Sequence, residues 1–339
     1  MGRFRHGRAL VYLHQVRYKL HLVQLFLHPR YHTRGHMAPW TASDIPPQTG
    51  RAAVVTGTGG LGFHDALALA RAGARVIIAG RNPQKGAAAV EAIRRSVPAA
   101  EVSFEPVDLA SLETIKAFAA RLRTTQGSLD LLINNAAVMA PPRRELTVDG
   151  FELQLGTNHL GHFALTAHLL PLLRKGSQPR VVSLSSVAAR AGALHFDDLQ
   201  SERGYKPMVA YGQSKLACLM FAFELQRQSD ANGWGLQSVA AHPGIARTDL
   251  LPNGAGAASP QAMIRRFLWF LFQPAAQGAL PTLYAATAPQ AKGGGYYGPD
   301  RLSETRGHPA AARMPLQALD EKDAARLWVE SARLTGAGF

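Results

Sequence analysis

The stretch from Val54 to Gly62 reads VVTGTGGLG, and it decides the fold. Its β-branched start is typical of a buried strand, and the apolar-periodic residues that follow the glycines predict a helix. Between strand and helix, glycines spaced as G-x-G-x-x-G permit a tight turn and a close approach of the backbone to a pyrophosphate, which the helix N-terminus can bind. The stretch therefore predicts a dinucleotide site, with a simple glycine-rich turn as the alternative.

The sequence on both sides of this stretch alternates short β-branched runs with longer apolar-periodic runs, which is typical of a parallel sheet with crossover helices. We predict strands at Ala52–Thr56, Arg75–Ala79, Val102–Val107, Leu129–Asn134, Arg180–Ser185 and Leu236–Ala241. We predict helices at Gly60–Ala72, Pro83–Arg95, Leu112–Thr124, Gly150–Leu173 and Met208–Gln228. The fold class is therefore α/β: a single Rossmann-type doubly wound domain with a mostly parallel sheet and helices on both faces. Such sheets bind ligands beyond the carboxyl ends of their strands.

The composition fits a globular protein, because 47 % of the 339 residues are apolar and 18 % are charged. The single cysteine, Cys218, cannot form an internal disulfide, so a reducing, cytoplasmic location is expected. The formal net charge of +14 would suggest nucleic acid or an anionic membrane as a partner. Half of that charge lies in residues 1–36, which carry seven Arg or Lys and no acid. With this segment set aside, no nucleic-acid partner is expected.

Residues 1–36 form a basic N-terminal extension that we separate from the fold. Three origins stay open for it: a targeting peptide, a basic arm for a membrane or nucleic acid, or translated upstream sequence before a true start at Met37, which we favour. Arg17 and Lys19 interrupt its apolar residues, so no transmembrane segment is expected, although peripheral membrane contact stays open. Residues 37–339 contain no internal linker and are interpreted as one cofactor-binding catalytic domain.

The residue after the second predicted strand indicates which cofactor is bound. NAD sites usually place an acid there, about 20 residues past the glycines, to accept from the ribose 2′-hydroxyl. Here Arg81 follows the strand and no acid appears before Glu91, so a 2′-phosphate is the better ligand and NADP(H) is favoured over NAD(H). A solvated surface arginine is the alternative. Asp108 and the pair Asn135-Ala136 follow the next two strands beside the same crevice, with a helix cap and a strand-end turn as alternatives.

Tyr211 and Lys215 lie four residues apart in the long predicted helix, so both face the same side. A phenol is a poor base at neutral pH, and a nearby ammonium favours its phenolate. The pair is therefore suited to general acid or base chemistry. Taken alone, the Y-x-x-x-K spacing is common by chance, and a surface pair one helical turn apart is its simpler explanation.

In order and spacing, these and other stretches resemble the short-chain dehydrogenase/reductase family from about residue 40 to residue 339. The matching stretches are Thr56–Gly62, Asn134–Ala136, Asn158–Phe163, Val181–Ser186, Tyr211–Lys215 and Pro243–Gly244. The resemblance implies an NADP(H)-dependent oxidoreductase that interconverts a carbonyl and an alcohol by hydride transfer. Ser186 would hold the substrate oxygen and Tyr211 would pass its proton. Lys215 would favour the phenolate and hold the nicotinamide ribose, and Asn158 would anchor a water that links Lys215 to solvent.

The resemblance also implies a set of cofactor contacts. They are Thr56, Gly57, Thr58, Gly60, Leu61, Gly62, Arg81, Asp108, Leu109, Asn135, Ala136, Tyr211, Lys215, Pro243, Gly244 and Thr248. Pro243-Gly244 with Thr248 is similar to the segment that fixes the nicotinamide carboxamide. The usual family loop reads T-G-x-x-x-G-x-G, and the loop from Thr56 to Gly62 is one residue shorter. An altered geometry of the loop is therefore expected. Ala137 also departs from the family, where glycine is commoner.

Within the family, the chain looks most like the branch of retinol dehydrogenases, the WW-domain oxidoreductase and protochlorophyllide reductase. The shared features are a long insertion from His195 to Tyr205 and the ending Gly294–Pro299. This likeness implies an apolar small-molecule substrate and leaves a homo-oligomer open. A cofactor-binding sensor or scaffold without turnover is the alternative function, but such a protein would not need all four catalytic side chains.

The remaining candidates have simpler interpretations. His159 and His162 lie in an apolar helix without acids or cysteines at ligand spacing, so packing is expected and no metal site is predicted. Cys218 lies seven positions past Tyr211 and is expected to pack in the core. The aromatic residues in the apolar part of the stretch from Leu251 to Pro274 could close over an apolar substrate or could cover the sheet. They are Phe267, Trp269, Phe270 and Phe272.

Overall fold

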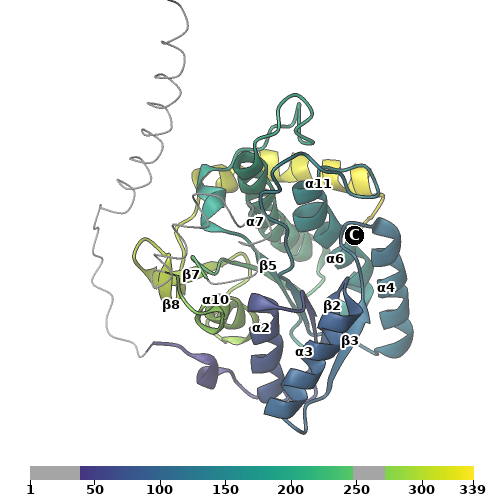
Figure 1. Ribbon diagram of the computed structural model, residues 1–339, viewed down its shortest axis with the longest axis vertical. Helices are drawn as coiled ribbons and strands as arrows, with labels where there is room; N and C mark the ends of the chain where they lie inside the picture. Colours follow the sequence, from purple (N-terminus) through teal and green to yellow (C-terminus); the bar gives the residue numbers. More distant parts are fainter. Residues whose placement is uncertain (1–38, 247–271) are drawn as a thin grey trace, which may run out of the picture.

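The structure is a computed structural model that describes residues 39–246 and 272–339 (Figure 1). Its centre is an eight-stranded sheet with the strand order β3-β2-β1-β4-β5-β6-β7-β8. The strands are β1 Ala52–Thr56, β2 Arg75–Gly80, β3 Val102–Pro106, β4 Leu131–Asn134, β5 Arg180–Leu184, β6 Gln237–Ala241, β7 Tyr296–Arg301 and β8 Arg306–Ala311. All neighbours pair in parallel except β7 and β8, which pair antiparallel. The predicted α/β fold with a mostly parallel, doubly wound sheet is confirmed.

Helices cover both faces of the sheet. The longer ones are α2 Gly60–Arg71, α3 Pro83–Ser96, α4 Leu112–Thr125, α6 Gly161–Leu173, α7 Pro207–Asn232, α10 Ala275–Thr287 and α11 Glu321–Thr335. The short ones are η1 Ala42–Asp44, α5 Leu153–Leu155, η2 Gly156–Leu160, η3 Val187–Ala191 and η5 Leu316–Leu319. Successive strand residues face opposite sides, so Val55 packs with α2, α3 and α10 while Val54 packs with α4, α6 and α7. Burial on both faces explains why the strands are almost continuously apolar.

The last two strands are an addition to the sequence-based prediction. The six predicted strands are present, with ends shifted by one or two residues, but the hairpin of β7 and β8 was not predicted. Its strands contain Gly298, Pro299, Gly307 and Pro309, and these residue types are typical of turns. A proline is tolerated in β8 because this strand is the edge of the sheet. The residue types of these two segments therefore do not indicate that they form strands.

The helix predicted from Gly150 to Leu173 begins three residues later and is not uniform. After α5 the chain forms the π-helix η2 and then continues as α6. Two glycines allow this segment to approach its neighbours closely: a Cβ on Gly156 would lie 2.5 Å from the methyl group of Thr147, and one on Gly161 would lie 2.3 Å from the Leu109 carbonyl oxygen. Single π-turns inside α-helices are frequent at functional sites.

Some predictions fall on residues outside the described ranges. They concern residues 1–36, Thr248, Phe267, Trp269 and Phe270. Among residues 39–246 and 272–339, no helix combines the length and the apolar character that crossing a membrane requires.

Candidate active site

The parallel strands end at one edge of the sheet, and the predicted site residues follow directly after these ends. They are Thr56 and Gly57 at the end of β1, Arg81 after β2, Asp108 and Leu109 after β3, Asn135 and Ala136 after β4, Ser186 after β5, and Pro243 and Gly244 after β6. Parallel pairing explains this gathering, because every carboxyl end then lies on the same side. Tyr211 and Lys215 are on α7, and Asn158 is on η2.

The glycine loop closes around the side chain of Asn135. Asn135 Nδ2 donates to the Thr56 carbonyl oxygen at 2.7 Å, and a Cβ on Gly57 or Gly62 would lie 2.8 or 2.6 Å from that nitrogen. Gly57 also has a φ of +102°, which favours glycine. The N-cap of α2, Gly59, makes no side-chain hydrogen bond, so no side chain caps the first-turn amides. The shortened loop thus keeps a strand–turn–helix geometry that suits a pyrophosphate.

The other predicted nucleotide contacts surround this loop. Arg81 is exposed and lies two residues before the first residue of α3. The Asp108 carboxylate accepts from Ala110 N at 3.0 Å through Oδ1 and so closes a turn, whereas the N-cap of α4 is Ser111 and not Asp108. Thr58 packs against Gly80, where an added Cβ would lie 2.9 Å from the threonine methyl group. The arrangement places one exposed guanidinium where the second strand ends, as an adenosine 2′-phosphate would require.

Thr56 joins the glycine loop to the helix that carries Asn158. Its Oγ1 accepts from Asn135 N at 2.9 Å and Ala136 N at 3.0 Å, and lies 3.0 Å from His162 Nε2. His162 Nδ1 lies 2.9 Å from the Asn158 carbonyl oxygen, which can only accept, so the proton is assigned to Nδ1 and Nε2 accepts from Thr56. Burial lowers the pKa of His162 to about 4, so the ring is neutral at neutral pH.

Lys215 and Ser185 hold α7 against the end of β5. Lys215 Nζ donates to the Leu184 carbonyl oxygen at 3.0 Å, and Ser185 Oγ donates to the Lys215 carbonyl oxygen at 2.8 Å. Tyr211 and Lys215 are both buried, with 6 % and 3 % of their surface exposed. Ser186, the next residue, caps η3 by accepting from Ala188 N at 3.2 Å. Tyr211 and Lys215 are therefore a buried pair, not a surface pair, and Lys215 contacts the end of β5, which Ser186 follows.

Asn158 links the loop after β4 to α7. Its amide accepts from Val138 N at 2.8 Å, donates to the Val138 carbonyl oxygen at 2.9 Å, and donates to Ser214 Oγ at 3.0 Å. Ser214 Oγ in turn donates to the Tyr211 carbonyl oxygen at 2.8 Å. Cys218, buried in the core, donates through Sγ to the Asn158 carbonyl oxygen at 3.1 Å. That Asn158 anchors a water stays a prediction.

His159 serves packing between helices. Its Nε2 lies 2.7 Å from Ser331 Oγ on α11, and its ring packs edge to face on Phe221. Burial lowers its pKa to about 3, so the ring is neutral. Within the described ranges, no group of three His, Cys, Asp or Glu side chains is arranged as a metal site.

Several residues of this region were not predicted from the sequence. Ser185 and Ser214 stand next to predicted residues, inside the serine pair and inside the Y-G-Q-S-K stretch, so their position was the available signal. Glu304, which bonds to Arg190 and His242, had no such signal because its hairpin was not predicted. His242 directly precedes Pro243 and could have been noticed there.

Comparison with known proteins finds a matching family model and relatives that cover most of the chain. A family model described as short chain dehydrogenase matches residues 51–255. Polyprenol dehydrogenase of Mus musculus is 42 % identical over 301 residues, which cover 87 % of this chain and 86 % of the relative. Retinol dehydrogenase 13 of Homo sapiens is 40 % identical over 293 residues, which cover 85 % of each chain.

Solved structures agree with these relatives. An uncharacterised protein from Mycobacterium paratuberculosis is 39 % identical, with a TM-score of 0.74, and the match covers 89 % of this chain and 99 % of that one. RhlG of Pseudomonas aeruginosa, solved with NADP, is 25 % identical, with a TM-score of 0.59, and the match covers 74 % of this chain and 96 % of that one. The chain belongs to the short-chain dehydrogenases, oxidoreductases that bind a nicotinamide cofactor and act on small molecules.

Proposed function

We propose that this chain interconverts a carbonyl and an alcohol with NADP(H), and that Tyr211 is its general acid or base. The observation that carries the proposal is the anchoring of α7 by Lys215 and Ser185 at the end of β5. These bonds hold the helix with Tyr211 against the strand end with Ser186. A tyrosine and a lysine one turn apart on the surface of a helix would be exposed to solvent, whereas Tyr211 and Lys215 are buried.

Tyr211, Lys215 and Ser186 each have a separate role in the proton transfer. When bound, the nicotinamide supplies hydride to the carbonyl carbon or takes it from the alcohol carbon. In reduction, Tyr211 Oη gives its proton to the substrate oxygen, and the Lys215 ammonium stabilises the remaining phenolate. Ser186 Oγ accepts from Ala188 N and so keeps its own proton to donate to the developing oxyanion. In oxidation the Tyr211 phenolate takes the proton back.

Tyr211→Phe tests this mechanism because it removes the proton donor and keeps the ring. We expect turnover to fall by about 10²–10⁴-fold, with the affinity for NADPH, measured by calorimetric titration, nearly unchanged. Tyr284→Phe on α10 is a matched control that should leave turnover intact. Equal turnover by Tyr211→Phe and the wild type would contradict the mechanism. A wild type that binds NADPH but reduces no carbonyl would favour the sensor or scaffold.

The preference for NADP(H) rests on Arg81, and the NADP complex of RhlG supports it. The exposed Arg81 guanidinium follows β2, and a charge-assisted hydrogen bond to a 2′-phosphate contributes about 1.5–3 kcal/mol. Arg81→Ala should therefore weaken NADPH binding by about 10–100-fold and leave NADH binding unchanged. Arg75→Ala, at the opposite end of β2, is the control. Tighter binding of NADH than NADPH by the wild type would overturn the preference.

An apolar substrate is the best candidate. The relatives at about two fifths identity are named for polyprenol and retinol, both of which are apolar alcohols. An NADPH-coupled screen across short polar and long apolar aldehydes, ketones and alcohols tests this class. Higher kcat/KM for the short polar compounds would contradict it.

A further inference from the structure

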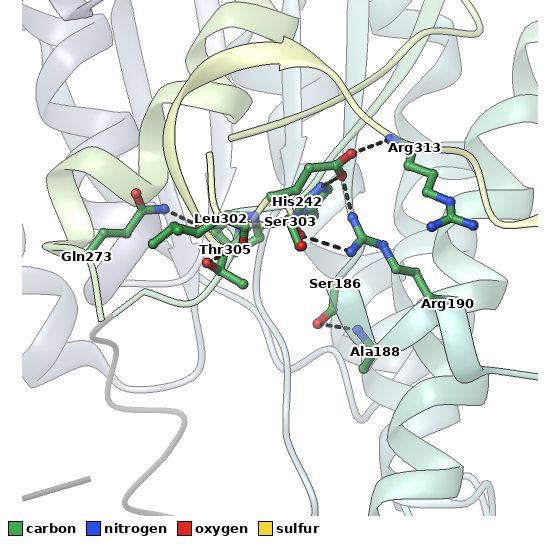
Figure 2. A network of polar contacts seen from close by, with 12 residues as sticks. Ser186, Ala188, Arg190, His242, Gln273, Leu302, Ser303, Thr305 and Arg313 are labelled. Carbon is green, nitrogen blue, oxygen red and sulfur yellow. Dashed lines mark hydrogen bonds and ion pairs between the residues drawn. The ribbon is translucent and has the colours of Figure 1, made fainter. Parts of the chain in front are cut away.

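The hairpin turn between β7 and β8 carries a carboxylate with three partners. Glu304 Oε2 forms an ion pair with Arg190 Nη2 and lies 3.1 Å from His242 Nε2, while Oε1 accepts from Arg313 N at 2.8 Å. In Figure 2, dashed lines join Arg190, His242 and the main-chain nitrogen of Arg313 to one unlabelled carboxylate, which these contacts identify as that of Glu304. One side chain thus joins four separate parts of the chain.

Two of these partners belong to elements that carry proposed site residues. Arg190 lies in the last turn of η3, the short helix that Ser186 caps. His242 directly precedes Pro243, and its Nδ1 accepts from Gly244 N at 3.2 Å. Because Nδ1 accepts, the ring proton is assigned to Nε2, which donates to Glu304. Burial lowers the pKa of His242, in keeping with a neutral ring.

The backbone of this turn is strained. Leu302, Ser303 and Glu304 have φ values of +47°, +54° and +66°. Residues other than glycine rarely adopt this left-handed region, and three in succession persist only where the surroundings hold them. Arg190 Nη1 also donates to the Ser303 carbonyl oxygen at 3.1 Å, so the same arginine holds both the carboxylate and the strained backbone.

The turn packs directly on the predicted nicotinamide segment. Ile245 N donates to the Thr305 carbonyl oxygen at 2.8 Å. Gly244 has a φ of +65°, and a Cβ built on it would lie 2.4 Å from that same oxygen. The hairpin turn therefore holds the segment after β6 together with Gln273, which donates to the Pro243 and Ile245 carbonyl oxygens. Glu304 in turn connects the hairpin turn to η3.

We propose that Glu304 is a positioning residue that fixes the segment Pro243–Gly244 relative to Ser186, and with it the nicotinamide relative to the substrate oxygen. The inference rests on the proposed function of the same site. A charged carboxylate is required for this role. Burial alone would raise the pKa of Glu304, but the His242 hydrogen bond, the Arg190 charge and the Arg313 amide together lower it, so the carboxylate is ionised at neutral pH.

Glu304→Gln tests the proposal because it keeps the shape of the side chain and removes its charge. Displacing reacting groups by about 1 Å can cost on the order of 10²-fold in rate, so we expect kcat to fall by about 10–100-fold. NADPH affinity should change little, since its adenosine half binds at β1 and β2. The primary isotope effect with 4-deuterated NADPH should rise as hydride transfer becomes slower. Glu330→Gln, which breaks an exposed ion pair with Arg333 on α11, is the matched control.

A second readout needs no turnover. The fluorescence of bound NADPH comes from the nicotinamide ring, so its emission should shift towards that of free NADPH in Glu304→Gln but not in Glu330→Gln. If the wild type binds no NADPH, the proposed function itself fails. If the wild type binds and turns over while Glu304→Gln matches it in kcat, isotope effect and emission, only the role of Glu304 is refuted.

Arg190→Met provides an independent variant if Glu304→Gln does not fold. It removes the other half of the ion pair and should lower kcat by a similar factor. Combined with Glu304→Gln it should cause little further loss, because both changes break one connection. Losses that multiply in the double variant would show two unrelated effects and would contradict the proposal.

Discussion

The glycine loop after β1 and the helix α7, which carries Tyr211 and Lys215, lie at the same edge of the sheet, but different interactions hold them. The loop depends on close packing, since Gly57 and Gly62 both leave space that the Asn135 side chain fills. The helix depends on buried hydrogen bonds to its neighbours, from Lys215 to the Leu184 carbonyl oxygen and from Asn158 to Ser214. Close packing fails when a single atom is added, whereas a hydrogen-bond network weakens one bond at a time. The two regions should therefore respond differently to substitution.

Gly62→Ala should have the largest effect on the loop. The added Cβ would lie 2.6 Å from Asn135 Nδ2 and 2.7 Å from the Gly57 carbonyl oxygen, so the loop must shift. We expect destabilisation of about 1–3 kcal/mol and a loss of NADPH affinity of about 100-fold, equal to about 3 kcal/mol. Urea unfolding and calorimetric titration measure the two quantities. Gly127→Ala, with nothing within 4 Å of its Cβ, is the control, and equal behaviour of both variants would refute the steric argument.

Thr56→Val tests the connection between the two regions. The change keeps the shape but removes the Oγ1 acceptor of the half-buried amides of Asn135 and Ala136, of which Asn135 N keeps the Ile133 carbonyl oxygen, and this should cost about 1–3 kcal/mol in the free energy of unfolding. Thr282→Val is the matched control, because the Thr282 hydroxyl is fully buried and has no partner among the described residues. It should be neutral or stabilising. A smaller loss for Thr56→Val than for Thr282→Val would contradict this interpretation.

Ser214→Ala should weaken the network around α7 without disturbing the loop. It removes the acceptor of Asn158 Nδ2 and the donor to the Tyr211 carbonyl oxygen. We expect kcat to fall by about 10-fold, equal to about 1.4 kcal/mol, while NADPH affinity stays unchanged. Ser238→Ala, at a buried hydroxyl without a partner in the described structure, should leave both unchanged. If Ser214→Ala lowered the affinity for NADPH rather than kcat, the glycine loop and α7 would not respond differently to substitution.

Asp65 on α2 should give an effect that shows only as a change of stability with pH. The side chain is fully buried, neither oxygen has a partner in the described structure, and burial raises its pKa well above the ordinary value of 3.8. Between the unfolded and folded pKa values the folded state holds the extra proton. Its contribution to stability is therefore complete below the unfolded pKa and is lost as the pH rises through the folded pKa.

The free energy of unfolding of the wild type should thus fall with rising pH in this window, by up to about 1.4 kcal/mol per pH unit. Asp65→Asn cannot ionise, so its curve should lack this fall. Urea unfolding of both proteins from pH 4.5 to pH 8.5 makes the comparison. Parallel curves would mean that Asp65 does not hold a proton in the folded state.

The parts of the molecule that were predictable are those encoded locally. Strands such as Ala52–Thr56 are short runs of small apolar and β-branched residues, and the predicted site residues follow strand ends, which parallel pairing brings to one edge. The contacts that were not predicted join distant segments. Thr56 and His162 are 106 residues apart, and Arg190 and Glu304 are 114 apart. No local pattern specifies such pairs, because each depends on how packed elements meet.

The π-turn η2 limits which changes in chain length this helix can accept. Successive side chains of an α-helix point about 100° apart around the helix axis. One extra residue in a turn therefore changes the direction of the side chains that follow it relative to those that precede it. Asn158 thereby reaches Val138 and Ser214 while His162, one turn later, reaches Thr56. Deleting Thr157 would restore a regular helix and rotate one of these groups away from its partners. Among homologous chains, insertions and deletions should therefore be absent from residues 156–160, even where the neighbouring loops vary in length.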